Sequence, residues 1–155
     1  MELRGKKIGF VLTGSFCTFK KIIPKIKELI KLEANIIPIM SFNSYNLDTK
    51  FGKAQDFIKD IEEITNKKII HTIVDAEPIG PKNMTDIMII APCSGNTIAK
   101  LACDIIDTPA VMAAKSHLRN NKPLVIAPST NNGLSRKCRK YRKIIKHKKL
   151  LFCTI

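Results

Sequence analysis

Small polar side chains follow four apolar stretches of this sequence, at the points where each stretch ends. The apolar stretches span residues 7–12, 35–40, 87–91 and 124–127. Hydroxyl, amide and backbone N–H groups at such strand–helix junctions are the usual partners of a phosphate or cofactor in an open α/β sheet. Any one of these turns alone is also typical of a capped helix or a plain turn. Their convergence on one sheet edge favours a cofactor site.

The first of these turns is the one best suited to a phosphate. Gly14 follows the first strand and permits a backbone turn that other residues resist, while Ser15 and Thr18 offer hydroxyls where a helix begins. Gly9 and Gly14 do not form the pattern GxGxxG, so a dinucleotide fingerprint is absent. The pattern therefore predicts phosphate binding without predicting a dinucleotide.

No residue stands out as a general acid or base, and the catalytic residues are left unassigned. Cys93, Lys100 and Lys115 are candidates only by position, and a cysteine after a core strand commonly packs as a small buried thiol. His71 is the one histidine predicted to lie near the sheet, and most such histidines are structural or exposed.

Apolar periodicity predicts the elements that must position these side chains. The unbroken apolar run at 87–91 predicts a central strand buried on both faces, ended by Pro92. A short strand or edge segment is predicted over 69–74. Helical spacing predicts helices over residues 19–34, 51–65, 98–105 and 109–119. The expected fold is α/β: a three-layer, Rossmann-like (flavodoxin-like) parallel sheet with helices on both faces.

The composition is that of one cytoplasmic domain. With 155 residues, 45% of them hydrophobic, the chain has enough apolar material for a single core. Its apolar runs fall far short of the ~20 residues of a membrane span, so we expect no membrane association. The five cysteines form no CxxC pair, and scattered thiols fit a reducing cytoplasm better than a disulfide framework or a metal site.

The net charge of +14 is concentrated at the end of the chain. Residues 136–155 hold nine Lys and Arg and no acidic residue, whereas residues 1–135 hold 18 basic side chains against 13 acidic ones. We therefore predict a domain over 1–135 followed by a basic tail over 136–155. A strong positive charge is typical of nucleic-acid binding, but because it rests on the tail we expect no specific nucleic acid partner.

The motifs resemble those of a known superfamily. Residues 91–102 (APCSGNTIAKLA), followed by Asp107, Thr108 and Pro109, resemble the homo-oligomeric flavin-containing cysteine decarboxylases, a superfamily of FMN-binding Rossmann-like proteins. A closer resemblance is to the family of dipicolinate synthase B chains from spore-forming bacteria. It rests on residues 5–15, 76–82, 112–115 and 119–121, and it covers residues 4–135.

This resemblance implies an FMN site, a homo-oligomer and an oxidoreductase role. Gly14, Ser15 and Thr18 would meet the phosphate of FMN. The residues implied to approach the flavin or its ribityl chain are Ser41, Asn43, Ser94, Asn96 and Thr97. The chain would act during sporulation with a separate dipicolinate synthase A chain, which holds the NAD(P), to oxidise a dihydrodipicolinate-level intermediate to dipicolinate.

Two other functions stay open. One is an FMN-dependent decarboxylase or prenyltransferase of the same superfamily. The decarboxylases use an early histidine and a Pro-x-Met-Asn segment, but residues 19–31 contain no histidine and residues 128–131 (PSTN) lack the methionine. The other is a non-catalytic basic protein that binds polyanions through residues 136–155.

The basic tail itself departs from the family. It holds 3 Arg and 6 Lys, whereas residues 1–135 hold 2 Arg and 16 Lys. Back-translation with AT-rich codons and removal of one base after Ser135 gives a helix-turn-strand sequence that resembles the family. We therefore predict that residues 136–155 are a frameshift product lacking the family's last helix and strand. Resequencing the gene is the check, and an undisturbed reading frame would refute the prediction.

Overall fold

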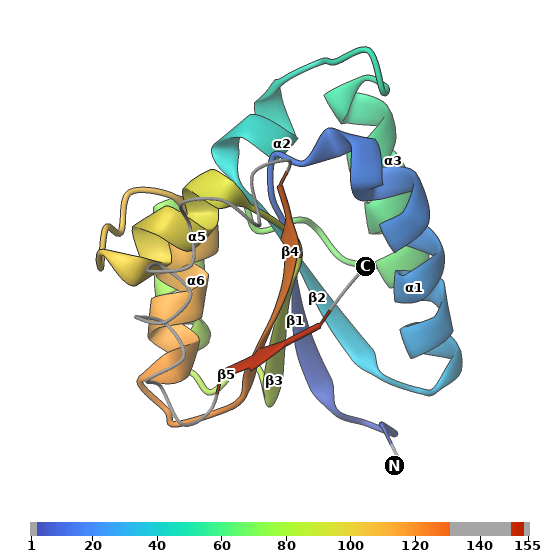
Figure 1. Cartoon of the computed structure of the whole chain (residues 1–155). Coiled ribbons are helices and arrows are strands. Elements are labelled where there is room, and N and C mark those ends of the chain that lie inside the picture. The colour runs from blue at the N-terminus through green and yellow to red at the C-terminus, as the bar shows by residue number, and fades with distance from the viewer. Residues whose placement is uncertain (1–2, 131–149, 154–155) are drawn as a thin grey trace.

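A single parallel sheet forms the centre of the computed structural model, which describes residues 3–130 and 150–153. Its five strands lie in the order β2-β1-β3-β4-β5 (Figure 1). Their bounds are β1 (Lys7–Leu12), β2 (Asn35–Met40), β3 (Ile87–Ser94), β4 (Leu124–Ser129) and β5 (Leu150–Phe152). Because every pairing is parallel, the carboxyl ends of all strands meet at one edge.

Helices cover both faces of the sheet, which confirms the predicted three-layer α/β fold. In Figure 1, α1 (Phe19–Lys31) and α3 (Ala54–Thr65) lie on one side of the strands, and α5 (Gly95–Ala102) and α6 (Pro109–Leu118) lie on the other. The remaining helical segments are short: η1 (Phe16–Thr18), α2 (Phe42–Asn46), α4 (Ile73–Ala76) and η2 (Glu77–Ile79).

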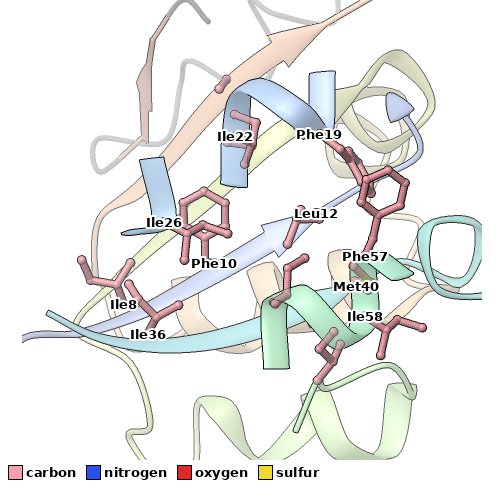
Figure 2. Close-up of a cluster of buried hydrophobic side chains, with 14 of the residues drawn as sticks. Ile8, Phe10, Leu12, Phe19, Ile22, Ile26, Ile36, Met40, Phe57 and Ile58 are labelled. Atoms are coloured by element: carbon pink, nitrogen blue, oxygen red, sulfur yellow. The ribbon is translucent and has the colours of Figure 1, made fainter. Parts of the chain in front are cut away.

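Each face of the sheet has its own hydrophobic core, because successive strand residues point to opposite faces. On one face, β1 and β2 pack against α1 and α3, as Figure 2 shows. The labelled core residues are Ile8, Phe10, Leu12, Phe19, Ile22, Ile26, Ile36, Met40, Phe57 and Ile58. On the other face, Val11, Met88 and Ile90 are fully buried in the core that includes residues of α5 and α6. The central strands are therefore buried on both sides, as their apolar runs predicted.

Two strands are longer than predicted, and the prediction that Pro92 ends the central strand is wrong. β3 continues through Pro92 to Ser94, with a cis peptide bond between Ala91 and Pro92. The register with β4 shifts between Ile90 and Cys93, and an irregularity of this kind accommodates a residue that has no N–H to donate. β4 likewise extends to Ser129.

The segment over 69–74 and the end of α5 also differ from prediction. Within this segment only Ile70 pairs with the sheet, through an isolated bridge to Ile39. Thr72 then caps α4 by accepting a hydrogen bond from the N–H of Asp75 (3.0 Å), so a helix replaces the predicted strand. α5 ends at Ala102 because Asp104 adopts a left-handed conformation (φ 55°), which leaves Ile105 exposed instead of on a helix face.

The basic tail lies largely outside the described residues. The predicted boundary near residue 135 falls within residues 131–149, of which the structure gives no description. Leu150–Phe152 lie within the predicted tail and nevertheless pair with Leu124, Val125 and Ile126 as β5, so the expectation that the tail leaves the sheet without a last strand is wrong. The frameshift itself stays a prediction. No helix within the described ranges is long and apolar enough to cross a membrane.

His117 on α6 is fully buried, so His71 is not the one histidine near the sheet. Its Nε2 lies 2.9 Å from the carbonyl oxygen of Pro123, and its Nδ1 lies 2.8 Å from Oγ1 of Thr85. Because a carbonyl can only accept, Nε2 donates its proton to Pro123. Burial lowers the pKa of His117 below its ordinary value, which favours the neutral ring, and in that form Nδ1 accepts from the Thr85 hydroxyl.

We expect the stabilisation contributed by His117 to decrease with falling pH. Its folded-state pKa is lowered, so the unfolded chain binds the proton more readily. The stabilisation is fully present above the unfolded pKa of about 6.5 and is lost as pH falls from there towards the folded value. His117→Gln should reduce the free energy of unfolding by about 2 kcal/mol at pH 8 and by less at pH 5. Urea unfolding at both pH values measures this, and a difference that grows at pH 5 would contradict it.

Candidate functional site

Two cavities lie at the carboxyl edge of the sheet, and Gly14 lines both of them. The first has a volume of about 370 Å³, and we call it the Asn96 cavity. It is lined by Gly14, Ser41, Phe42, Asn43, Ser94, Asn96, Thr97, Lys100, Asp107 and Thr108. The second has a volume of about 320 Å³, and we call it the Ser129 cavity. It is lined by Gly14, Ser15, Phe16, Cys17, Phe51, Gly95, Ser129 and Thr130.

Seven of the eight predicted binding residues line these cavities. Six of them line the Asn96 cavity: Gly14, Ser41, Asn43, Ser94, Asn96 and Thr97. Ser15 lines the Ser129 cavity together with Gly14. Thr18 is buried and lines neither, although its hydroxyl lies 2.8 Å from that of Ser129. The turns therefore converge as the sequence pattern predicted, and Thr18 reaches the site through Ser129.

The first turn is held against the end of β4. The Ser15 hydroxyl donates to the carbonyl oxygen of Ser129 at 2.8 Å, and the hydroxyls of Thr18 and Ser129 share a hydrogen bond. Ser129 stands in the fourth polar turn of the sequence, but no sequence signal distinguished it from its neighbours. These contacts fix the Ser129 cavity between the ends of two strands that are not adjacent in the sheet, β1 and β4.

The feature of Gly14 that matters for the cavities is its lack of a side chain, and not its backbone conformation. Within the described residues only Gly5 and Gly52 among the glycines have positive φ, so the prediction of a special turn at Gly14 is wrong. A Cβ built on Gly14 would lie 3.7 Å from the Cβ of Asn43 and 3.9 Å from a ring carbon of Phe16. It would thus project into the site without a clash.

Thr13 follows β1 and connects it to the end of β3 through side-chain hydrogen bonds. The sequence did not reveal this role. The Thr13 side chain is fully buried. Its hydroxyl donates to the carbonyl oxygen of Pro92 at 2.7 Å and accepts from the N–H of Ser94 at 2.8 Å. Ser94 is the last residue of β3 and caps α5. Thr13 therefore positions the junction of β3 and α5 relative to its chain neighbour Gly14.

We expect Thr13→Val to lower the free energy of unfolding by about 2 kcal/mol, because it removes the acceptor of the Ser94 N–H and one of the two donors to the Pro92 carbonyl, which keeps only the Thr13 N–H at 3.3 Å. Thr13→Ser retains the hydroxyl and should lose less than about 1 kcal/mol. Urea unfolding of the two variants and the wild-type chain checks this. Equal losses of unfolding free energy for Thr13→Val and Thr13→Ser would show that the Thr13 hydroxyl does not contribute to stability.

Three helices begin at the Asn96 cavity, each with a hydroxyl cap. Ser41 caps α2, Ser94 caps α5 and Thr108 caps α6, each accepting from the N–H three residues later. Thr108 belongs to the motif that carries the family resemblance, but the sequence did not indicate it as a site residue. Asn43 and Asn96 are exposed, and their side-chain amides have no hydrogen-bond partner within the described part of the chain. Both amides are therefore available to a ligand.

Lys100 and Asp107 form an ion pair in the wall of the same cavity. The Lys100 ammonium donates to both carboxylate oxygens of Asp107 at 2.7 Å. Of the predicted catalytic candidates, Lys100 is thus the one that the structure places in this site. The Cys93 side chain is fully buried. Burial raises the pKa of its thiol, which disfavours a reactive thiolate.

The other candidates lie elsewhere. Lys115 lines a different, largely apolar cavity between α5 and α6, which Lys100 also borders. His71 stacks on Tyr45, with ring centroids 3.9 Å apart, and lines a groove that includes α3 residues. No group of three or more His, Cys, Asp or Glu that could hold a metal ion occurs in the described ranges.

The donors present fit a flavin mononucleotide. Hydroxyl-bearing residues and Gly95, the first residue of α5, line the Ser129 cavity, and hydroxyls beside a helix N-terminus suit a phosphate. The Asn96 cavity combines the amides of Asn43 and Asn96 with the exposed aromatic ring of Phe42, which suits a planar heterocycle. Gly14 lines both cavities and, as a glycine, places no side chain of its own between them.

A parallel sheet with such a polar edge is the arrangement found in α/β proteins that bind phosphate-bearing ring compounds. The chain belongs to the Flavoprotein family, whose model matches residues 1–151. That match extends beyond the range 4–135 predicted from the motifs.

Particular relatives place the chain more narrowly within the family. It is 42% identical to the B subunit of dipicolinate synthase from Bacillus subtilis (strain 168), over 97% of this chain and 76% of that protein. The crystal structure of the dipicolinate synthase B subunit from Bacillus halodurans C matches with a TM-score of 0.87 and 39% identity, over 98% of this chain and 78% of that one. Both agree with the family that the sequence motifs indicated.

More distant structures share the fold. The DmrB protein of Burkholderia xenovorans, solved in complex with FMN as a cubic protein cage for redox transfer, matches with a TM-score of 0.74 and 16% identity. The match covers 97% of this chain and 88% of that one. At this identity the likeness concerns the fold alone.

Proposed function

We propose that this chain binds FMN across the two joined cavities. The observation that carries the proposal is that seven separately predicted residues, from three turns, line two cavities that meet at Gly14. Ser15, Ser129 and the start of α5 would hold the phosphate. Asn43, Asn96 and Phe42 would contact the ring. Bound FMN would supply reversible hydride transfer, and the residues of the chain would bind and orient it and exclude water.

We further propose that the chain works within a cytoplasmic dipicolinate synthase during sporulation. With a separate A chain that holds the NAD(P), it would oxidise a dihydrodipicolinate-level intermediate to dipicolinate. Support comes from the 42% identity to a dipicolinate synthase B subunit, a name that implies a second subunit. Assembly into a homo-oligomer belongs to the same proposal, and it is supported by DmrB, which has the same fold and is described as a cubic protein cage.

The residues of the site favour this function over a decarboxylase. A decarboxylase of the superfamily would need an early histidine, and α1 contains none. The two histidines in the described ranges, His71 and His117, both lie outside the two cavities.

Reconstitution with the A chain tests the subunit role. We expect formation of pyridine-2,6-dicarboxylate only when both chains are present, with a rate that rises on addition of FMN. Asn96→Leu should lower the rate, whereas Gln55→Leu, which alters an exposed residue of α3 away from both cavities, should not. Full activity of the A chain alone, or equal activity with and without FMN, would count against the proposal.

A further inference from the structure

The ion pair between Lys100 and Asp107 forms the charged part of the Asn96 cavity. Among the described residues that line this cavity, these two alone carry charged side chains. The Lys100 side chain is 20% exposed and that of Asp107 is 53% exposed. The Lys100 side chain is therefore the less exposed member of the pair, and the Asp107 side chain is more open to solvent.

The pair stands apart from the expected phosphate position. Lys100 and Asp107 line the Asn96 cavity but not the Ser129 cavity, which contains Ser15 and Ser129. A cation placed to hold the phosphate of the cofactor would be expected in the second cavity. The positive charge on Lys100 is thus available to bind a ligand group other than the phosphate of the cofactor.

The chemistry of the pair suits an anionic ligand. An ammonium has three N–H donors, and within the described residues its hydrogen bonds are the two to Asp107. The remaining donor, partly shielded from water, would form a charge-assisted hydrogen bond with a carboxylate. The first turns of α5 and α6 also border this cavity, and their dipoles favour negative charge there.

We propose that Lys100 binds a carboxylate of the substrate, a ring compound carrying carboxylate groups, and that Asp107 positions the ammonium for this contact. The inference rests on the proposed function and assigns the substrate end of the same site. Asp107 both orients Lys100 and reduces the net positive charge of the cavity. A ligand carboxylate would share the ammonium with Asp107 and would not need to displace it.

Calorimetric titration of the FMN-loaded chain with pyridine-2,6-dicarboxylate tests the inference. Lys100→Met should weaken binding by about tenfold to a hundredfold, which corresponds to a lost charge-assisted hydrogen bond. Asp107→Asn keeps the cation and an amide oxygen that can still accept from the Lys100 ammonium and hold it in place, and it removes the competing negative charge, so its affinity should equal or exceed that of the wild type. Lys115→Met is the matched control, because Lys115 is an exposed lysine that does not line this cavity, and it should bind as the wild type does.

The two substitutions separate this role from a structural one. A pair that only joins α5 to the start of α6 predicts that both substitutions weaken binding in the same direction. Equal losses for Lys100→Met and Asp107→Asn, or wild-type affinity of Lys100→Met, would overturn the inference. The FMN affinity of each variant is measured separately, because both residues line the cavity proposed for the flavin ring, and a loss of dicarboxylate affinity that only parallels a loss of FMN affinity would overturn the inference. Failure of the wild-type chain to take up FMN would instead refute the proposed cofactor site. Pyridine-2,6-dicarboxamide, the uncharged analogue, should not distinguish Lys100→Met from the wild type.

Discussion

Replacement of Gly80 by alanine should destabilise the chain by about 3 kcal/mol, because the methyl group would force α6 away from the turn that follows η2. A Cβ at this position would lie 2.3 Å from the backbone oxygen of Ser116 and 2.7 Å from its Oγ. Gly80 also donates its N–H to the Ser116 hydroxyl at 2.8 Å and accepts from the amide of Asn120 at 2.7 Å. The substitution therefore combines overpacking with lost hydrogen bonds.

Gly14→Ala is the matched control for this substitution. It adds the same methyl group at a glycine where the new Cβ makes only ordinary contacts, the nearest at 3.7 Å. We expect a change below about 1 kcal/mol in the free energy of unfolding, measured in urea for both variants. A loss at Gly80 no larger than the loss at Gly14 would show that α6 adjusts easily.

Gly14→Leu should abolish most of the FMN affinity while leaving the fold intact. The side chain would grow from the point where the two cavities meet, between Asn43 and Phe16. It would therefore occupy space that a ligand spanning both cavities needs. We expect affinity for FMN to fall roughly a hundredfold, or about 2.7 kcal/mol, in equilibrium ultrafiltration.

The folded state of this variant must be checked independently. Its unfolding midpoint in urea should remain close to that of Gly14→Ala, because a Cβ at this position makes only ordinary contacts and the further atoms would enter the cavities that Gly14 lines. An unchanged affinity for FMN in folded Gly14→Leu would place the ligand in one cavity only or outside both. Either result would require a different arrangement of the cofactor from the one proposed.

Much of the fold could be predicted because its strands are continuous apolar runs. Ile87 to Ala91 indicated a strand buried on both faces, and the polar turns after each strand indicated the edge where a ligand binds. Seven of the predicted residues then line the two cavities, because parallel strands bring their carboxyl ends together whatever their separation in the sequence.

Features that depend on tertiary contacts could not be predicted. Pro92 remains within β3 because a register shift accommodates it, and the sequence does not encode that shift locally. Thr13 and Ser129 act through partners that are distant in sequence, 79 and 114 residues away, so no local pattern could reveal them. Thr18 carries the right side chain, but it is buried, and its hydroxyl bonds to that of Ser129 instead of lining a cavity.

The most direct test of the account is a visible-absorbance titration of the purified chain with FMN. We expect a saturable shift of the flavin absorption band at one FMN per chain, which the Gly14→Leu substitution should remove. The titration should be repeated on a version whose tail, residues 136–155, is restored to the alternative reading frame. Binding by the restored version alone would support both the flavin site and the predicted frameshift. Absence of binding by both versions, each shown to be folded, would contradict the central claim that these cavities hold FMN.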